Sequence, residues 1–461
     1  MSFSDLTFIL YFLPAFTVGY WLIPYRLRGA FLFLGSLGFY FWGAGVWNTA
    51  ILLVLILASY ALARQMDCYG GGNKTPLILG LILNIGCLLY FKYTGFFLDN
   101  LGRLLSAEFS FTALALPLGI SFYVFQSIAY LVDVYRGTIS AERSIIKYAA
   151  FLTAFPQLTM GPILRYGTWK EDLCNRFLDR HELEQGFQLF VVGLCCKVLI
   201  ADQLASLWAS LERIGFEFLS TPLAWLGAFG YSLQLYFDFS GYSLMAMGLG
   251  QMLGIGIPRN FDLPYCARSV SEFYRRWHIT LGAWFRDYLY IPLGGSRRGV
   301  KRMVLALTVV WVLTGLWHGA DWNFVLWGIV LLFFILLEKL CIGDFLREHA
   351  FLSHLYLLAV IPPTWVIFRI SDLNALGAYL SRMFPFFGAP ETIYAEDFMN
   401  YFSQYWLLFL IAAVLCLPQP RRFYEKYKGS VIVWLPLFLL FWLCIYMISL
   451  SSGNSFLYAC F

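Results

Sequence analysis

Two of the five histidines lie where an imidazole could do chemistry, and the first is His318. It ends an apolar run that begins near Met303. If that run is a membrane-crossing helix, it carries His318 roughly 22 Å into a hydrocarbon core about 30 Å thick. An ionisable group at that depth is costly and indicates function, and an imidazole can take up and return a proton near neutral pH. Gly315 and Gly319 flank it and let a substrate or a neighbouring backbone come close. The alternative is a core histidine that only packs beside Trp317.

The second histidine, His278, lies in a basic and aromatic segment. Read as one helix, Glu272–Gly282 places Arg275, His278 and Gly282 on one face. Such a helix often lies in the membrane interface, where His278 has no chemical role. The functional alternative is the wall of a donor entrance, in which Arg275 and Arg276 bind the phosphates of a coenzyme or a phosphopantetheine arm.

Asp238 is a third ionisable group inside an apolar stretch, Gln234–Tyr242. A carboxylate in hydrocarbon needs a partner. It could orient one of the histidines, pair with an arginine such as Arg165, or form a purely structural ion pair. The sequence leaves these three possibilities open.

The composition indicates which elements position these residues. Of 461 residues, 60% are hydrophobic and 13% are charged, whereas soluble domains have about 25% charged residues. The mean hydropathy of +0.69 predicts an all-α polytopic membrane protein. The net charge of +5 (32 − 27) is typical of basic cytosolic loops and does not indicate nucleic-acid binding. The ten cysteines are scattered without a C-x-x-C pair, so no metal site is expected.

Apolar runs recur along the whole chain and predict about a dozen helical segments. No polar gap between them is long enough for a soluble domain, so residues 1–461 are expected to form a single membrane domain with a core at about 112–341. After a first helix near Phe8–Pro24, the runs cover 30–47, 49–63, 76–97, 112–132, 186–200, 222–257, 303–317, 322–341, 355–370, 405–418 and 431–450, with 222–257 broken in two.

Two stretches do not fit a simple series of crossings. Residues 148–164 are interrupted by Pro156 and by Gly161-Pro162 and have basic residues on both flanks, which predicts a re-entrant segment enclosed by protein. Residues 259–302 carry nine basic side chains and are expected in the cytosol. If 186–200 crosses the membrane once and 222–257 crosses it twice, the number of crossings places 259–302 outside the cytosol, against its basic charge. One of these segments therefore does not span, and the sequence does not say which.

Seven blocks of sequence together resemble the membrane-bound O-acyltransferase family. The resemblance covers nearly the whole chain, and the last two blocks in that order are highly specific. Within the family, the chain looks most like the branch that acetylates exported bacterial polysaccharides such as alginate. The blocks are Pro117–Gln126, Asp133–Arg136, Phe155–Arg165, Tyr236–Tyr242, Arg275–Leu281, Trp284–Gly295 and Gly315–Ala320.

The resemblance implies a ring of about 11–12 transmembrane helices, with re-entrant or interfacial helices, around a central tunnel. It implies that the histidine matching His318 is catalytic and that the one matching His278 is a second, supporting site. The other residues expected to support the reaction or line the tunnel are Trp317, Asn323, Asp238, Arg275, Arg276, Gln157 and Arg165.

The expected reaction is O-acetyl transfer. In this hypothesis, acetyl-CoA enters from the cytosol near 259–302, and His318 is the general base for a hydroxyl that attacks the thioester. Asn323 or a backbone N–H near Gly319 could stabilise the oxyanion. No bound cofactor is expected besides the donor. The resemblance implies a bacterial inner membrane, an exported polysaccharide, and an acceptor that is either the glycan or a serine on a periplasmic SGNH-type partner.

Three alternatives remain open. The chain could move D-alanine to teichoic acid from a carrier-protein thioester, since that branch has the same two histidine contexts. It could be a transporter or flippase for an acyl donor or a glycan, because it has a broken segment and buried charges. A non-catalytic scaffold is the third possibility, although burying an imidazole without use is costly.

Overall fold

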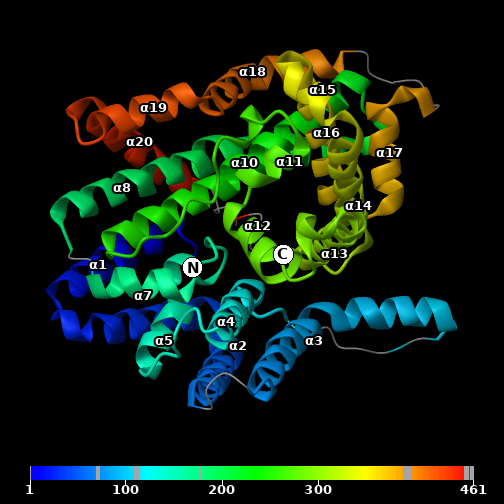
Figure 1. The fold of residues 1–461 in the computed structure, drawn as a ribbon. Helices are drawn as coiled ribbons and strands as arrows, with labels where there is room; N and C mark the ends of the chain where they lie inside the picture. The colour runs from blue at the N-terminus through cyan, green and yellow to red at the C-terminus, as the bar shows by residue number, and fades with distance from the viewer. Residues whose placement is uncertain are drawn as a thin grey trace. The chain divides into compact units, whose positions relative to one another are not determined.

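Every regular element in the described part of the protein is a helix, as predicted (Figure 1). The computed structural model describes residues 2–68, 73–107, 109, 115–175, 178–387, 396–450 and 456, with the backbone alone at 173–175. In these ranges, eight helices are long and apolar enough to cross a membrane. Two shorter apolar helices cover Phe8–Leu22 and Ile120–Tyr135. The all-α polytopic class is therefore confirmed.

The chain forms two compact units. The first consists mainly of Met1–Phe190 and Tyr242–Pro258, and the second mainly of Val191–Gly241 and Arg259–Leu457. Each unit is described by itself below. The single domain over 1–461 stays a prediction.

In the first unit, α2 (Arg28–Cys68) packs against α3, α4 and α5. Gly45 interrupts α2 with a φ of 79°, a conformation that glycine adopts without steric cost. The two runs predicted at 30–47 and 49–63 are therefore two arms of one kinked helix. The other helices of this unit are α1 (Leu13–Leu22), α3 (Thr75–Leu105), α4 (Ile120–Tyr135), α5 (Ile145–Thr153), α6 (Phe155–Leu158), α7 (Tyr166–Asn175) and the first part of α8 (Arg180–Cys195).

The stretch predicted to be re-entrant folds as two short helices followed by irregular backbone. Helix α5 ends at Thr153, because the next residue, Ala154, has a non-helical ψ of 111°, and α6 has Pro156 in its first turn. Residues 148–158 and 160–164 are buried. Protein thus encloses the irregular backbone, which is the condition for a segment that does not span.

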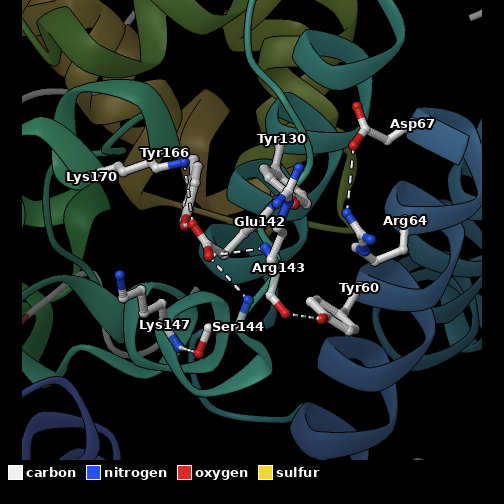
Figure 2. Close-up of polar contacts among 10 residues, drawn as sticks. All are labelled: Tyr60, Arg64, Asp67, Tyr130, Glu142, Arg143, Ser144, Lys147, Tyr166 and Lys170. Atoms are coloured by element: carbon white, nitrogen blue, oxygen red, sulfur yellow. Dashed lines mark hydrogen bonds and ion pairs between the residues drawn. The ribbon is translucent and has the colours of Figure 1, made fainter. Parts of the chain in front are cut away.

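A buried carboxylate fixes the loop between α4 and α5, as Figure 2 shows. Glu142 is 5% exposed and accepts hydrogen bonds from the N–H groups of Arg143 (2.9 Å) and Ser144 (3.0 Å). Its second oxygen accepts from the Tyr166 hydroxyl at 2.6 Å and lies 3.4 Å from Lys170 Nζ. Burial alone would raise the pKa of Glu142, but the hydrogen bonds from Tyr166 and Ser144 and the charge of Lys170 lower it overall.

The second unit contains α9 to α20 and the first part of α10. Most of these helices are regular, but π-helical turns occur at Cys196–Ala201, Arg286–Tyr290 and Glu338–Ile342. The helices are α9 (Asp202–Ile214), α10 (Thr221–Met252), α11 (Val270–Arg276), α12 (Ile279–Phe285), α13 (Val300–His318), α14 (Trp322–Leu337), α15 (Gly343–Glu348), α16 (Ala350–Arg369), α17 (Leu373–Met383), α18 (Asp397–Leu415), α19 (Pro418–Tyr427) and α20 (Val431–Leu450).

Helix α10 corrects one expectation. The stretch 222–257 was predicted to break in two, but Thr221–Met252 is one continuous helix that is buried along most of its length. A helix surrounded by protein needs no lipid-facing apolar surface, so it can carry polar residues at any depth. The cytosolic side expected for 259–302 stays a prediction.

We expect Glu142→Ala to lower the free energy of unfolding by about 3 kcal/mol, because it leaves buried donors without an acceptor. Thermal unfolding of the purified protein in detergent at pH 7 measures this. The control, Lys170→Met, removes an ion pair to a half-exposed lysine and should cost at most about 1 kcal/mol. Because the pKa of Glu142 is lowered, its contribution is present at neutral pH and is lost as the pH falls below about 4.5. Equal losses in the two variants would contradict this account.

Candidate active site

His318 is held at the end of a hairpin formed by α13 and α14, which lie side by side in Figure 1. A Cβ on Gly315 would lie 2.3 Å from the carbonyl oxygen of Phe324. A Cβ on Gly328 would lie 2.5 Å from the carbonyl oxygen of Trp311. The two helix backbones are therefore in direct contact. Of the two roles expected for Gly315, the structure shows close approach of a neighbouring backbone.

Aromatic rings surround the His318 imidazole. Its ring centroid lies 4.9 Å from that of Trp317, 5.2 Å from that of Trp327 and 5.0 Å from that of Phe368, all in edge-on arrangements. These rings come from α13, α14 and α16, and His318 is only 4% exposed. The rings exclude bulk water, so polar interactions with this imidazole are stronger than they would be in solvent.

The segment of His278 corrects a second expectation. It is not one helix: α11 ends at Arg276 and α12 begins at Ile279. His278 joins them in the left-handed conformation, with φ 47° and ψ 53°. Backbone bonds to the preceding segment cause the break, since Asp262 N–H donates to Arg276 O and Ile279 N–H donates to Asn260 O, both at 2.9 Å. A sequence pattern cannot reveal such non-local bonds.

One cavity of about 390 Å³ joins the two histidines. Arg275, His278 and Gly282, predicted to share a face, all line it together with His318. The predicted grouping is therefore right although the helix is broken. The cavity volume lies in the range typical of small-molecule sites. Its mainly apolar walls include Leu281, Leu307, Val310, Trp311, Trp327 and Ile335.

The cavity follows the hairpin of α13 and α14. Its wall on α13 runs from Leu307 to His318, eleven residues or about 16 Å. On the antiparallel α14, the wall continues to Lys339, beyond the helix end. Lys339, Arg275 and Arg286 line the cavity and are exposed. Lys339, beyond the end of α14, therefore lies far along the cavity from His318, and Arg275 and Arg286 add positive charge to its wall.

Two predicted supporting residues hold the histidine from outside the cavity wall. Trp317 is buried, and its ring centroid lies 4.9 Å from that of His318 and 6.0 Å from that of His278. Asn323 is also buried, and its amide nitrogen donates to the carbonyls of Ile367 (3.2 Å) and Phe368 (2.9 Å). Asn323 therefore anchors the end of α16, and its donors are not directed at a reacting group.

Asp238 forms an ion pair with Lys197. Lys197 Nζ lies 2.7 Å from an Asp238 oxygen and 2.8 Å from one of Asp202, and both Lys197 and Asp238 are 2% exposed in their side chains. The structure thus shows an ion pair, with a partner that the sequence did not suggest, and whether Asp238 also supports the reaction stays a prediction. Lys197 lies in the π-helical turn Cys196–Ala201.

The remaining predicted residues are not part of the cavity wall. Arg276 is held by its own helix and loop: it pairs with Glu272 at 2.7 Å and donates to the Asp262 carbonyl at 3.3 Å. Gln157 and Arg165 lie in the first unit. Gln157 is buried, and its amide donates to Phe151 O at 2.7 Å, whereas Arg165 is half-buried just before α7. Their roles in the reaction stay predictions.

The sequence reasoning missed Lys339, Glu338 and Asn260. Glu338 is 5% exposed and accepts hydrogen bonds from the N–H groups of Val270 and Ser271, the latter at 2.9 Å. It thus ties the end of α14 to the start of α11. An acid followed by a lysine at the end of an apolar helix was a visible signal. No feature of the sequence pointed to Asn260, which contacts His278.

Comparison with known proteins finds a family match over the region that contains the site. Residues 139–368, which contain both histidines and the cavity, match the membrane-bound O-acyltransferase family. The chain is 39% identical over 400 residues to a probable alginate O-acetylase of Pseudomonas syringae pv. tomato, covering 84% of this chain and 76% of that one.

Two further relatives have other names. Identity to the peptidoglycan O-acetyltransferase of Helicobacter pylori is 37% over 375 residues, covering 72% of this chain and 69% of the relative. Identity to the teichoic acid D-alanyltransferase of Streptococcus thermophilus is 30% over 229 residues, covering 46% of this chain and 54% of the relative.

We expect Gly315→Ala to destabilise the protein by about 1–3 kcal/mol, because the new methyl group would push α13 and α14 apart. The measurement is thermal unfolding in detergent. Gly377→Ala is the matched control, since it adds a methyl group to helix α17 with no atom within 4 Å, and alanine favours helix formation. A Gly315→Ala protein as stable as Gly377→Ala would show that the contact is not tight.

Proposed function

Because the chain belongs to the membrane-bound O-acyltransferase family, we propose that it transfers an acetyl group from a cytosolic thioester, through the cavity of His318 and His278, to a hydroxyl acceptor. The chain is a multi-pass membrane protein and an O-acyltransferase. The proposal adds the acetyl group, the donor and the direction. The observation that carries it is one cavity lined both by exposed cations and by a buried imidazole.

The dimensions of the cavity support a pantetheine thioester. The arm of a coenzyme or of a carrier protein has about the backbone length of four to five extended residues, roughly 15 Å. The wall from Leu307 to His318 is about 16 Å long. An arm that enters between the cations would therefore bring its thioester to His318. A nucleotide or a carrier protein would stay outside the cavity.

The cations at the open end support an anionic donor. Arg275 and Lys339 are exposed and line the cavity, and Arg286, which also lines it, is ion-paired with Asp287 at 2.7 Å. Pantetheine itself is neutral, but it is joined to a phosphate in both coenzyme A and a carrier protein. A phosphate beside Arg275 and Lys339 would form charge-assisted hydrogen bonds.

His318 acts as the general base in this proposal. It takes the proton of the acceptor hydroxyl as the oxygen attacks the thioester carbon. A carbon–oxygen bond forms, the carbon–sulfur bond breaks, and the imidazolium returns the proton to the departing thiolate. The products are an acetyl ester and a free thiol, so no other reactant is consumed.

We place the acceptor in an exported polysaccharide pathway in the bacterial inner membrane. Relatives named for alginate and peptidoglycan O-acetylation match over most of the chain. The acceptor is either the glycan hydroxyl or a serine of a periplasmic SGNH-type partner that passes the acetyl group on. The second candidate is D-alanyl transfer from a carrier protein, favoured by the relative named teichoic acid D-alanyltransferase.

The first test is acetyl transfer by the purified protein in lipid vesicles. We expect it to cleave acetyl-CoA labelled on the acetyl group, and to pass label to a candidate periplasmic acceptor. His318→Ala should lose about 10²–10⁴-fold in both steps. The control is His181→Ala, which changes an exposed histidine.

Equal turnover in both variants would refute the role of His318. Turnover only with an acylated carrier protein would favour the D-alanyl candidate, and substrate flux that persists in His318→Ala would favour a transporter.

The second test concerns the cations at the open end. We expect Lys339→Met to raise the KM for acetyl-CoA about tenfold, since a hydrogen bond to a charged group contributes about 1.5 kcal/mol. The KM for acetyl-pantetheine, which has no phosphate, should not change. Lys301→Met is the control, because Lys301 is an exposed lysine of the basic 259–302 segment and does not line the cavity. Equal changes for the two donors would contradict a phosphate site at Lys339.

A further inference from the structure

Asn260 holds His278 from the segment that precedes α11. It is fully buried, and its carbonyl oxygen accepts the N–H of Ile279 at 2.9 Å. Its side-chain oxygen lies 3.1 Å from His278 Nδ1. The same oxygen lies 3.2 Å from the N–H of Thr280 and 2.9 Å from the Thr280 hydroxyl. One asparagine thus contacts three successive residues at the break between α11 and α12.

The contacts to Thr280 identify which atom of the Asn260 amide faces His278. A backbone N–H can only donate, so the amide atom beside Thr280 must be the oxygen. A flipped amide would place its NH₂ group against that N–H, with two donors facing each other. The oxygen cannot donate, so His278 Nδ1 must carry the proton in the bond to Asn260.

This leaves Nε2 as the nitrogen with a lone pair. His278 lines the cavity, and its Nε2 is buried without a hydrogen-bond partner among the described residues. The rings packed on the imidazole are Phe239, at 4.8 Å between centroids, and Trp317, at 6.0 Å. Burial lowers the pKa of His278 to about 3, which agrees with a neutral ring.

We propose that Asn260 is a positioning residue that fixes His278 as the Nδ1–H tautomer, so that Nε2 accepts a hydrogen bond from an N–H or O–H group of the substrate in the cavity. The tautomer follows from the contacts alone. Its use in catalysis rests on the proposed acyl transfer. His278 is then a fixed acceptor that orients the substrate, while His318 moves the proton.

The left-handed backbone conformation of His278 indicates that surrounding contacts hold this residue in place. A φ of 47° is unfavourable for a residue other than glycine and persists only where the surroundings enforce it. The hydrogen bonds of Asn260 to Ile279 and Thr280 provide that constraint. The bond at Nδ1 then fixes the ring as well as the backbone.

Nitrogen-15 NMR of the full-length protein, labelled on histidine, tests the tautomer directly. The signals of His278 are those missing from His278→Gln. We expect a protonated Nδ1 and an unprotonated Nε2, unchanged between pH 8 and pH 5. A protonated Nε2 at pH 6 or above would overturn the proposal. This readout does not require activity, so it is independent of whether the protein transfers acetyl groups.

Two variants separate tautomer control from a merely structural role. Asn260→Leu removes the acceptor and should shift the proton to Nε2, with at least a tenfold loss of acetyl transfer. Thr280→Val keeps the Thr280 N–H that fixes the amide, so the tautomer should stay as in the wild type. If Asn260→Leu folds and keeps the Nδ1–H form, the proposal is wrong. If Asn260→Leu does not fold, a changed tautomer in Thr280→Val contradicts the proposal and an unchanged one supports it.

Discussion

The site depends on the direct contact between α13 and α14. At Gly315 and Gly328, the carbonyl of one helix occupies the space that a side chain on the other would need. This close approach brings Trp327 of α14 against His318 at the end of α13. The antiparallel arrangement has a second consequence. It places Lys339, beyond the end of α14, far along the same cavity from His318, so one contact between backbones fixes both ends of the site.

Buried carboxylates in this protein form the ties between elements. Glu142 closes the loop before α5, Asp238 joins α10 to the π-helical turn of Lys197, and Glu338 joins α14 to α11. A buried charge that loses its partner is strongly destabilising, so each tie permits little displacement. The tie at Glu338 matters most for the chemistry. It links the helix that packs on His318 to the short helix that leads to His278.

The sequence identified what depends on residue type and depth, but not what depends on long-range pairing. His318 was predicted because an ionisable side chain ends a long apolar run, and Arg275, His278 and Gly282 were predicted to share a face. The break at His278 was missed because its cause is backbone hydrogen bonds between residues far apart in the sequence, from Ile279 to Asn260 and from Asp262 to Arg276. Lys197, the partner of Asp238, is forty-one residues away and lies in a π-helical turn. Lys339 belongs to the cavity only because α14 folds back on α13.

The two histidines differ in a way that suits different tasks. A general base must gain and lose a proton in each cycle, whereas a group that orients a substrate works best when its protonation never changes. His278 is held by Asn260, and burial lowers its pKa to about 3, which favours a neutral ring. His318 is packed among the rings of Trp317, Trp327 and Phe368. In the proposed reaction, the two imidazoles of one cavity therefore divide the work: the bond to Asn260 defines the protonation state of His278, and His318 moves the proton.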